Sequence, residues 1–89
     1  MKMTERQIHN RAVALTVMIE GLLIANRNTA GEVKWLVFDR GLPKILHHVP
    51  TTEKLICRVS DQDCQYGFPP GRWNHIKREC MEFLRKENK

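Results

Sequence analysis

The feature that most constrains this chain is an apolar run from residue 12 to residue 25, AVALTVMIEGLLIA, whose single charge is Glu20. Apolar residues recur at alternating steps of four and three, which places them on one helix face: Ile8, Ala12, Leu15, Ile19 and Leu22. A second apolar set widens this face and leaves a narrow polar stripe: His9, Thr16, Glu20 and Arg27. A helix that is apolar almost all round belongs inside a protein or against another one.

The helix is predicted to begin after Thr4. The order Thr4-Glu5-Arg6-Gln7 fits a capping box, in which the side chains of the first and last residues bond each other's backbone amides. The polar residues 26–31 predict a turn after the helix.

The apolar run also resembles two kinds of membrane-related segment. A membrane span needs about 20 mostly apolar residues, and this run is shorter and carries Glu20. A signal peptide needs a basic start, a short apolar region and a small-residue cleavage site. Glu5, Glu20 and the lack of a good cleavage site argue against a signal peptide. We therefore expect a cytoplasmic protein with no membrane partner.

The chain has 89 residues, which predicts one small domain, residues 1–89. A domain of this size has a core that is barely sufficient, and only one other convincing helix is available to cover the first. One expectation is therefore a homo-oligomer or a protein partner on the uncovered side; the alternative is that the middle of the chain closes over the helix. The predicted contact residues are Leu15, Met18, Ile19, Leu22, Leu23, Tyr66 and Phe68.

The middle of the chain predicts a three-stranded antiparallel meander. The segments 32–38, 43–49 and 54–59 are short and rich in β-branched or aromatic residues. Asp39-Arg40-Gly41 suits a three-residue hairpin loop with glycine in the left-handed conformation. Pro43 and Pro50 bound the second strand, which suits a sheet edge. With the flanking helices, this gives an α+β fold.

The same residues also permit an all-α fold of four or five short helices. Thr29 to Glu32 fits a second capping box, and Arg40-Gly41-Leu42-Pro43 fits a helix end. A further short helix, capped by Thr51 or Thr52, would then run to Val59. The short segments and their β-branched composition favour strands over helices for residues 32–59.

Residues 60–71, SDQDCQYGFPPG, predict a polar irregular loop in which Tyr66 and Phe68 either contact a partner or anchor the loop in the core. The last helix is predicted from about Gly71 to Glu87. Apolar residues at steps of three and four along it should cover the first helix: Trp73, Ile76, Cys80, Phe83 and Leu84.

The formal net charge is +5, which invites a nucleic-acid hypothesis. Acidic residues interleave with basic ones throughout, so no basic block singles out phosphate as the target. The residues that would contact phosphates are Arg72, Lys77, Arg78, Arg85 and Lys86. An ordinary solvated helix face explains the same residues.

Three cysteines favour reduced thiols in a cytosolic protein. Tetrahedral zinc needs four ligands, and four residues could supply them: Cys57, Cys64, His75 and Cys80. Their spacing matches no known zinc motif. We expect no metal or cofactor. His47 and His48 point to opposite faces of a strand, or diverge on a helix, and so cannot act together.

Taken together, these patterns predict a non-catalytic protein. We expect a regulatory or inhibitory protein that binds another macromolecule, with a protein as the partner and self-association as a homodimer or larger homo-oligomer. The alternative is a small basic nucleic-acid-binding regulator.

Overall fold

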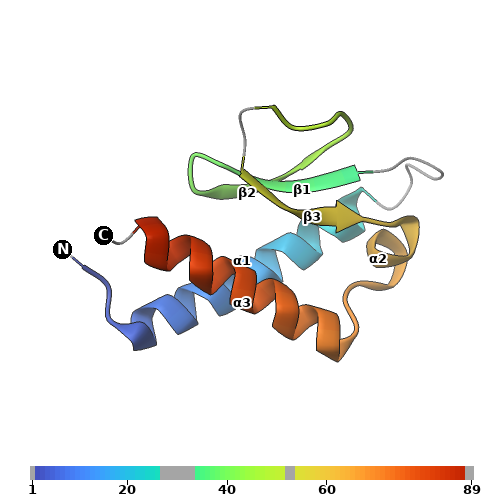
Figure 1. The fold of residues 1–89 in the computed structure, drawn as a ribbon. Helices are drawn as coiled ribbons and strands as arrows, with labels where there is room; N and C mark the ends of the chain where they lie inside the picture. Colours follow the sequence, from blue (N-terminus) through green and yellow to red (C-terminus); the bar gives the residue numbers. More distant parts are fainter. Residues whose placement is uncertain (1, 27–33, 52–53, 88–89) are drawn as a thin grey trace.

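The structure is a computed structural model that describes residues 2–26, 34–51 and 54–87. Two long helices lie on one side of a three-stranded antiparallel sheet, and the two termini lie at the same end (Figure 1). The predicted α+β class is confirmed, and the all-α alternative is wrong. The elements in chain order are α1 (Glu5–Ala25), β1 (Lys34–Asp39), β2 (Leu42–Leu46), β3 (Lys54–Val59), α2 (Asp61–Tyr66) and α3 (Pro70–Glu87).

Helix α1 begins with the predicted capping box. The Thr4 hydroxyl accepts from the Gln7 amide at 3.2 Å, and the Thr4 amide donates to Gln7 Oε1 at 2.8 Å. Two of the unpaired donors at the helix start are thereby satisfied. Asn26 caps the other end. Residues 27–31 of the predicted turn, and Glu32 and Val33 of the predicted first strand, lie outside the described residues.

The strand order is β2-β1-β3, so the sheet is not a meander. Both outer strands pair antiparallel with β1, and β3 does not pair with β2. Strand β1 is the central strand, and Leu36, Val37 and Phe38 in it are all buried. Strand β2 lies at the edge, where the missing N–H of Pro43 interrupts no second ladder. The described start of the β2–β3 connection, residues 47–51, rises on the side away from the helices (Figure 1).

The hairpin between β1 and β2 has a two-residue turn, one residue shorter than predicted. Arg40 and Gly41 both have positive φ, at 55° and 81°. Positive φ at both central positions defines the type I′ turn, whose twist matches that of a two-stranded ribbon. The left-handed conformation predicted for Gly41 is confirmed. Strand β2 begins at Leu42, one residue before the predicted start at Pro43.

Residues 60–71 are not wholly irregular, because they contain the short helix α2. Ser60 and Asp63 form a second capping box, with the Ser60 amide donating to Asp63 Oδ2 at 2.9 Å. The helix ends at Gly67, whose φ is 75°. Helix α3 then begins at Pro70, one residue before the predicted start.

One hydrophobic core joins both long helices, α2, β1 and β3. The Phe38 ring stacks on the Phe83 ring with 4.0 Å between centroids, which fixes α3 against the sheet. Helix α1 packs against α3, α2 and β2. At β3 the register skips Ile56, and this bulge lets Ile56 and Cys57 both pack against the core.

Candidate protein-binding surface

The only charge in the apolar part of α1 is directed into the chain. Glu20 Oε1 accepts from the Trp73 indole Nε1 at 2.9 Å, and Glu20 Oε2 lies 3.4 Å from the Phe68 amide, which donates to it. The half-buried carboxylate therefore holds α3 and the α2–α3 junction against α1. It contributes no charge to the opposite side of α1.

The predicted polar stripe of α1 thus faces α3 for part of its length. Thr16 is fully buried, and its hydroxyl donates to the Ala12 carbonyl at 2.7 Å. This bond to the preceding turn satisfies the hydroxyl without water. Thr16 and Glu20, two polar residues of this stripe, therefore lie at the contact between α1 and α3. His9, at the start of the stripe, is exposed.

The side of α1 that faces away from the core is apolar and exposed. Three of its large side chains are Val17, Met18 and Ile24, with exposed fractions of 57%, 43% and 48%. Between and beside them lie the exposed small residues Ala14, Gly21 and Ala25. We call these six residues the outer face of α1. It contains no charged residue, and contiguous exposed apolar surface of this kind marks interaction sites in monomeric proteins.

The structure divides the seven predicted contact residues into two groups. Leu15, Ile19, Leu23 and Phe68 are at most 8% exposed and belong to the chain's own core, so they do not line the outer surface. Met18 and Tyr66 are exposed, and Leu22 is half-buried. Leu15, Ile19 and Leu23 are buried because they share the helix face of Ile8 and Ala12, which turns toward α3 and the sheet; Leu22, predicted on the same face, lies at its margin.

Val17 and Ile24 were not among the contact residues predicted from the sequence. A helical projection places residue 17 about 160° from Ile19 and residue 24 about 140° from it, at 100° per residue. Once Ile8, Ala12, Leu15 and Ile19 are taken as the core face, the opposite side is therefore defined. The signal was present, but a helix that is apolar all round has no polar face to indicate which side meets water.

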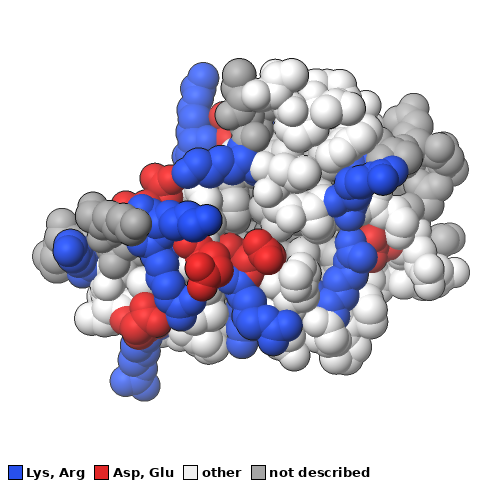
Figure 2. Space-filling model, in the orientation of Figure 1, with Lys and Arg blue, Asp and Glu red and all other residues white. Residues whose placement is uncertain are grey.

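The five candidate phosphate contacts do not form a basic patch. Arg85 bonds both Glu5 and Glu82, each at 2.8 Å, and Arg72 donates to the Arg58 carbonyl at 2.9 Å. Among the described residues, Lys77, Arg78 and Lys86 are left without an ion pair. Figure 2 shows basic and acidic side chains alternating over this face. Nucleic-acid binding therefore stays a prediction.

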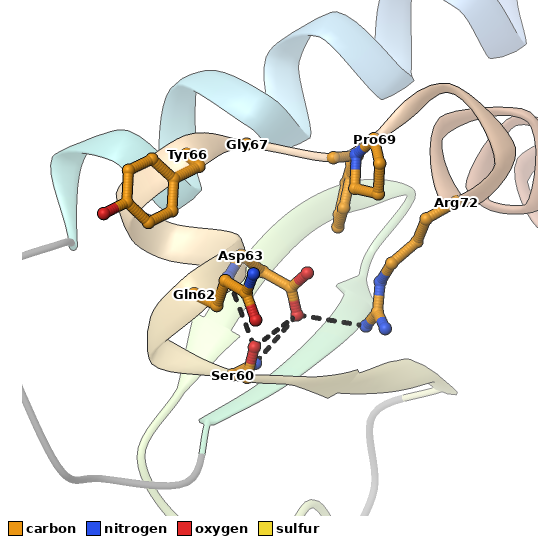
Figure 3. Close-up of a pocket in the computed structure, with 8 residues that line it drawn as sticks. Ser60, Gln62, Asp63, Tyr66, Gly67, Pro69 and Arg72 are labelled. Carbon is orange, nitrogen blue, oxygen red and sulfur yellow. Dashed lines mark hydrogen bonds and ion pairs between the residues drawn. The ribbon is translucent and has the colours of Figure 1, made fainter.

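A pocket of about 470 Å³ lies between α2 and the start of α3 (Figure 3). Its polar groups bond one another: Arg72 Nη2 lies 3.3 Å from Asp63 Oδ2, which also accepts from the Ser60 hydroxyl at 3.0 Å. The Tyr66 ring is turned away from this cluster and is 77% exposed. Arg72 and Asp63 thus join α2 to α3, and their charges offset each other.

Each of the three cysteines lies beside a different polar neighbour. Cys64 Sγ lies 3.6 Å from the Lys34 ammonium, Cys57 Sγ lies 4.0 Å from Arg72, and Cys80 lies beside Thr16. Burial raises the pKa of the Cys80 thiol to about 11 and also raises that of Cys57. Within the described residues no three potential metal ligands converge. The set considered for zinc, Cys57, Cys64, His75 and Cys80, is therefore not assembled.

Lys34 is fully buried, which the sequence did not indicate. Its ammonium donates to the Asn26 carbonyl at 2.7 Å, at the C-terminal end of α1. A cation at this end is favoured by the helix dipole and satisfies a terminal carbonyl. Lys34 therefore ties β1 to the end of α1.

Among the described residues, α1 is the one helix long and apolar enough to cross a membrane by length and composition alone. A core helix of a folded protein meets the same criterion. Here one side of α1 packs against α3, α2 and β2, and Glu20 lies in the middle of the helix. The expectations of a cytoplasmic location and of no membrane partner stay predictions.

Comparisons with protein-family models, with curated proteins and with solved structures find no match to this chain.

Proposed function

We propose that this chain is a non-catalytic regulatory or inhibitory protein that acts by binding another protein through the outer face of α1. The observation that carries the proposal is the exposure of Val17, Met18 and Ile24 on a helix side without charge. Fully burying an apolar side chain of this size is worth about 1.5–3 kcal/mol, and these three are about half exposed, so each would contribute roughly half of that on binding a partner. Together they would form the apolar centre of an interface, with further contacts around them supplying the rest of the affinity.

The rigidity of this face supports the proposal. Glu20, Thr16 and Ile19 fasten the opposite side of α1 to the core, so the exposed side chains start from a fixed backbone. A preformed surface loses less conformational entropy on binding than a segment that must first fold. Regulation or inhibition would follow from occupying a surface of the partner.

Site-specific photo-cross-linking in the native host tests the proposal. A photoactivatable residue replaces Val17 in one variant and the exposed Arg78 of α3 in a control. We expect a discrete cross-linked protein from position 17 only, and its loss when Ile24→Asp is added. The proposal fails if position 17 gives no adduct, or if both positions give the same set of adducts.

A further inference from the structure

We infer that a second copy of this chain occupies the outer face of α1, in an antiparallel α1–α1 contact around a two-fold axis. This inference rests on the proposed function, because the second copy would use the same protein-binding surface. It is argued from the pattern of large and small residues, the distribution of charge and the orientation of the helix dipoles.

The outer face alternates large and small side chains in a way that complements itself. A two-fold axis at the level of residue 19 sets Val17 of one copy opposite Gly21 of the other, and Ile24 opposite Ala14. Val17 and Ile24 therefore each meet a small residue, and the symmetry repeats both pairs; Met18 lies opposite position 20, where the Glu20 side chain is held inward by Trp73. A Cβ added at Gly21 would meet no atom within 4 Å, so the space above this glycine is open to a side chain from another molecule.

The charge distribution permits this self-pairing. With the axis at residue 19, positions 13 to 25 of one helix lie opposite positions 25 to 13 of the other. The exposed residues in this range are uncharged, and Glu20 is held inward by Trp73. No like charges therefore meet within the contact.

The dipoles and two exposed arginines in the first half of α1 favour the antiparallel arrangement over the parallel one. Antiparallel helices set the positive end of one dipole beside the negative end of the other. Parallel helices would instead bring Arg6 and Arg11 of the two copies together, and both side chains are exposed.

The length of the outer face sets the expected strength of the contact. From residue 14 to residue 25 it extends about 18 Å at the α-helical rise. Two such strips bury less than the approximately 800 Å² per partner of a standard interface. We therefore expect a reversible dimer with a dissociation constant in the micromolar range, which suits a surface that also exchanges partners.

Sedimentation equilibrium of the purified full chain over a wide concentration range tests the dimer, with Gly21→Leu as the decisive variant. The wild type should approach twice the 10.5 kDa chain mass as concentration rises. Gly21→Leu should stay near 10.5 kDa, because the new side chain fills the space for the partner's Val17. It should still fold, since leucine replaces glycine at an open helix position and favours the helix.

Val17→Asp is the second dissociating variant, and Arg78→Asp on the far helix is the control, which should dimerise as the wild type does. Disulfide formation then tests the orientation, with Cys57→Ser as the background. A mixture of Val17→Cys and Gly21→Cys chains should cross-link readily, whereas Asn10→Cys should not, because residues 10 of antiparallel copies lie about 27 Å apart along the helix.

The inference of a second copy is overturned if the mass of the wild type stays at 10.5 kDa at all concentrations. It is also overturned if the monomer binds lipid vesicles rather than a second copy. It is also overturned if Gly21→Leu still dimerises, or if Asn10→Cys cross-links as fast as the Val17→Cys and Gly21→Cys mixture. A monomer that cross-links from position 17 to a different protein in the host leaves the proposed function standing. A monomer with no such adduct removes both.

Discussion

The Glu20 carboxylate of α1 accepts a hydrogen bond from the Trp73 indole of α3 at 2.9 Å. This contact joins residues far apart in sequence and determines which side of α1 is inside. Because the single mid-helix charge is used internally, the outer face of α1 is left uncharged. The structural role of Glu20 and the proposed binding role of Val17, Met18 and Ile24 therefore belong to opposite sides of one helix.

Replacing Glu20 should loosen the α1–α3 contact. Glu20→Ala leaves the Trp73 indole N–H and the Phe68 amide without their acceptor. The free energy of unfolding should fall by about 1–3 kcal/mol, the cost of unsatisfied donors in a part-buried site. Glu20→Gln keeps an acceptor oxygen and should lose less. Urea denaturation followed by tryptophan fluorescence measures both, and equal losses would contradict the assigned contact.

Aspartate should reduce the stability of the chain strongly at residue 19 of α1 and hardly at all at residue 17. Ile19 is 0% exposed, so Ile19→Asp buries an unpaired charge and should cost more than about 3 kcal/mol. Val17 is 57% exposed, and Val17→Asp should change the stability of the dissociated chain by about 0.5 kcal/mol or less. Circular dichroism melts at low protein concentration compare the two. A similar loss for both variants would show that the helix is buried on all sides.

Cys80 should react more slowly than Cys57. Its pKa is raised to about 11, chiefly by burial, and the thiolate is the nucleophile. Iodoacetamide labelling near pH 8 with mass spectrometry should modify Cys57, which is half-buried, well before Cys80. Labelling of Cys80 at the rate of a free peptide thiol would contradict its burial.

The raised pKa of Cys80 also predicts a direction for stability at alkaline pH. The Cys80 thiol holds its proton more tightly in the folded state than in the unfolded chain, where the thiol has its ordinary pKa. The stabilising contribution is complete below that value and is lost as pH rises toward 11. Cys80→Ala should therefore show a shallower loss of stability over this range than the wild type does.

Lys34 should contribute to stability far more than another lysine of the same sheet. Lys34→Ala removes a fully buried side chain and its bond to the Asn26 carbonyl, at an expected cost of about 2–4 kcal/mol. Lys44 is exposed and lies 3.7 Å from Asp39, so Lys44→Ala should cost about 1 kcal/mol or less. Chemical denaturation of the two variants provides the comparison. Equal effects would contradict the burial of Lys34.

The alternative function, nucleic-acid binding, predicts an affinity for nucleic acid that falls steeply as the salt concentration rises. Two of its five candidate residues, Arg72 and Arg85, are already bonded within the chain. We therefore expect little binding to duplex or single-stranded nucleic acid, even at low salt. Affinity that falls steeply with salt would instead support phosphate contacts and favour the alternative function.

The ends of the fold were predictable from local signals. Thr4 and Gln7 fix the start of α1 through their side chains alone, and the periodic apolar residues of the last helix place α3 to within one residue. The strands were identified from β-branched and aromatic content. These features depend on residues close together in sequence, where spacing carries the information.

Other features depended on contacts between distant residues. The strand order could not be predicted, because a hairpin pattern does not say on which side the third strand pairs. Ser60 and Asp63 carried a capping signal for α2, but the glycine and prolines that follow suggested a loop. The outer face of α1 was assigned only in part, through Met18, because a helix that is apolar nearly all round has no polar face to mark the side that meets water.

Oxidation of Met18 measures most directly whether the outer face of α1 is a protein-binding surface. Met18 is 43% exposed in a single copy and lies on that face, whereas the half-buried Met81 of α3 lies outside it and serves as the internal reference. Purified chain is treated with dilute peroxide at low and at high protein concentration, and sulfoxide is quantified by mass spectrometry. We predict that Met18 oxidation slows relative to Met81 as concentration rises. A ratio that stays constant, in purified chain and in host lysate alike, would contradict the account.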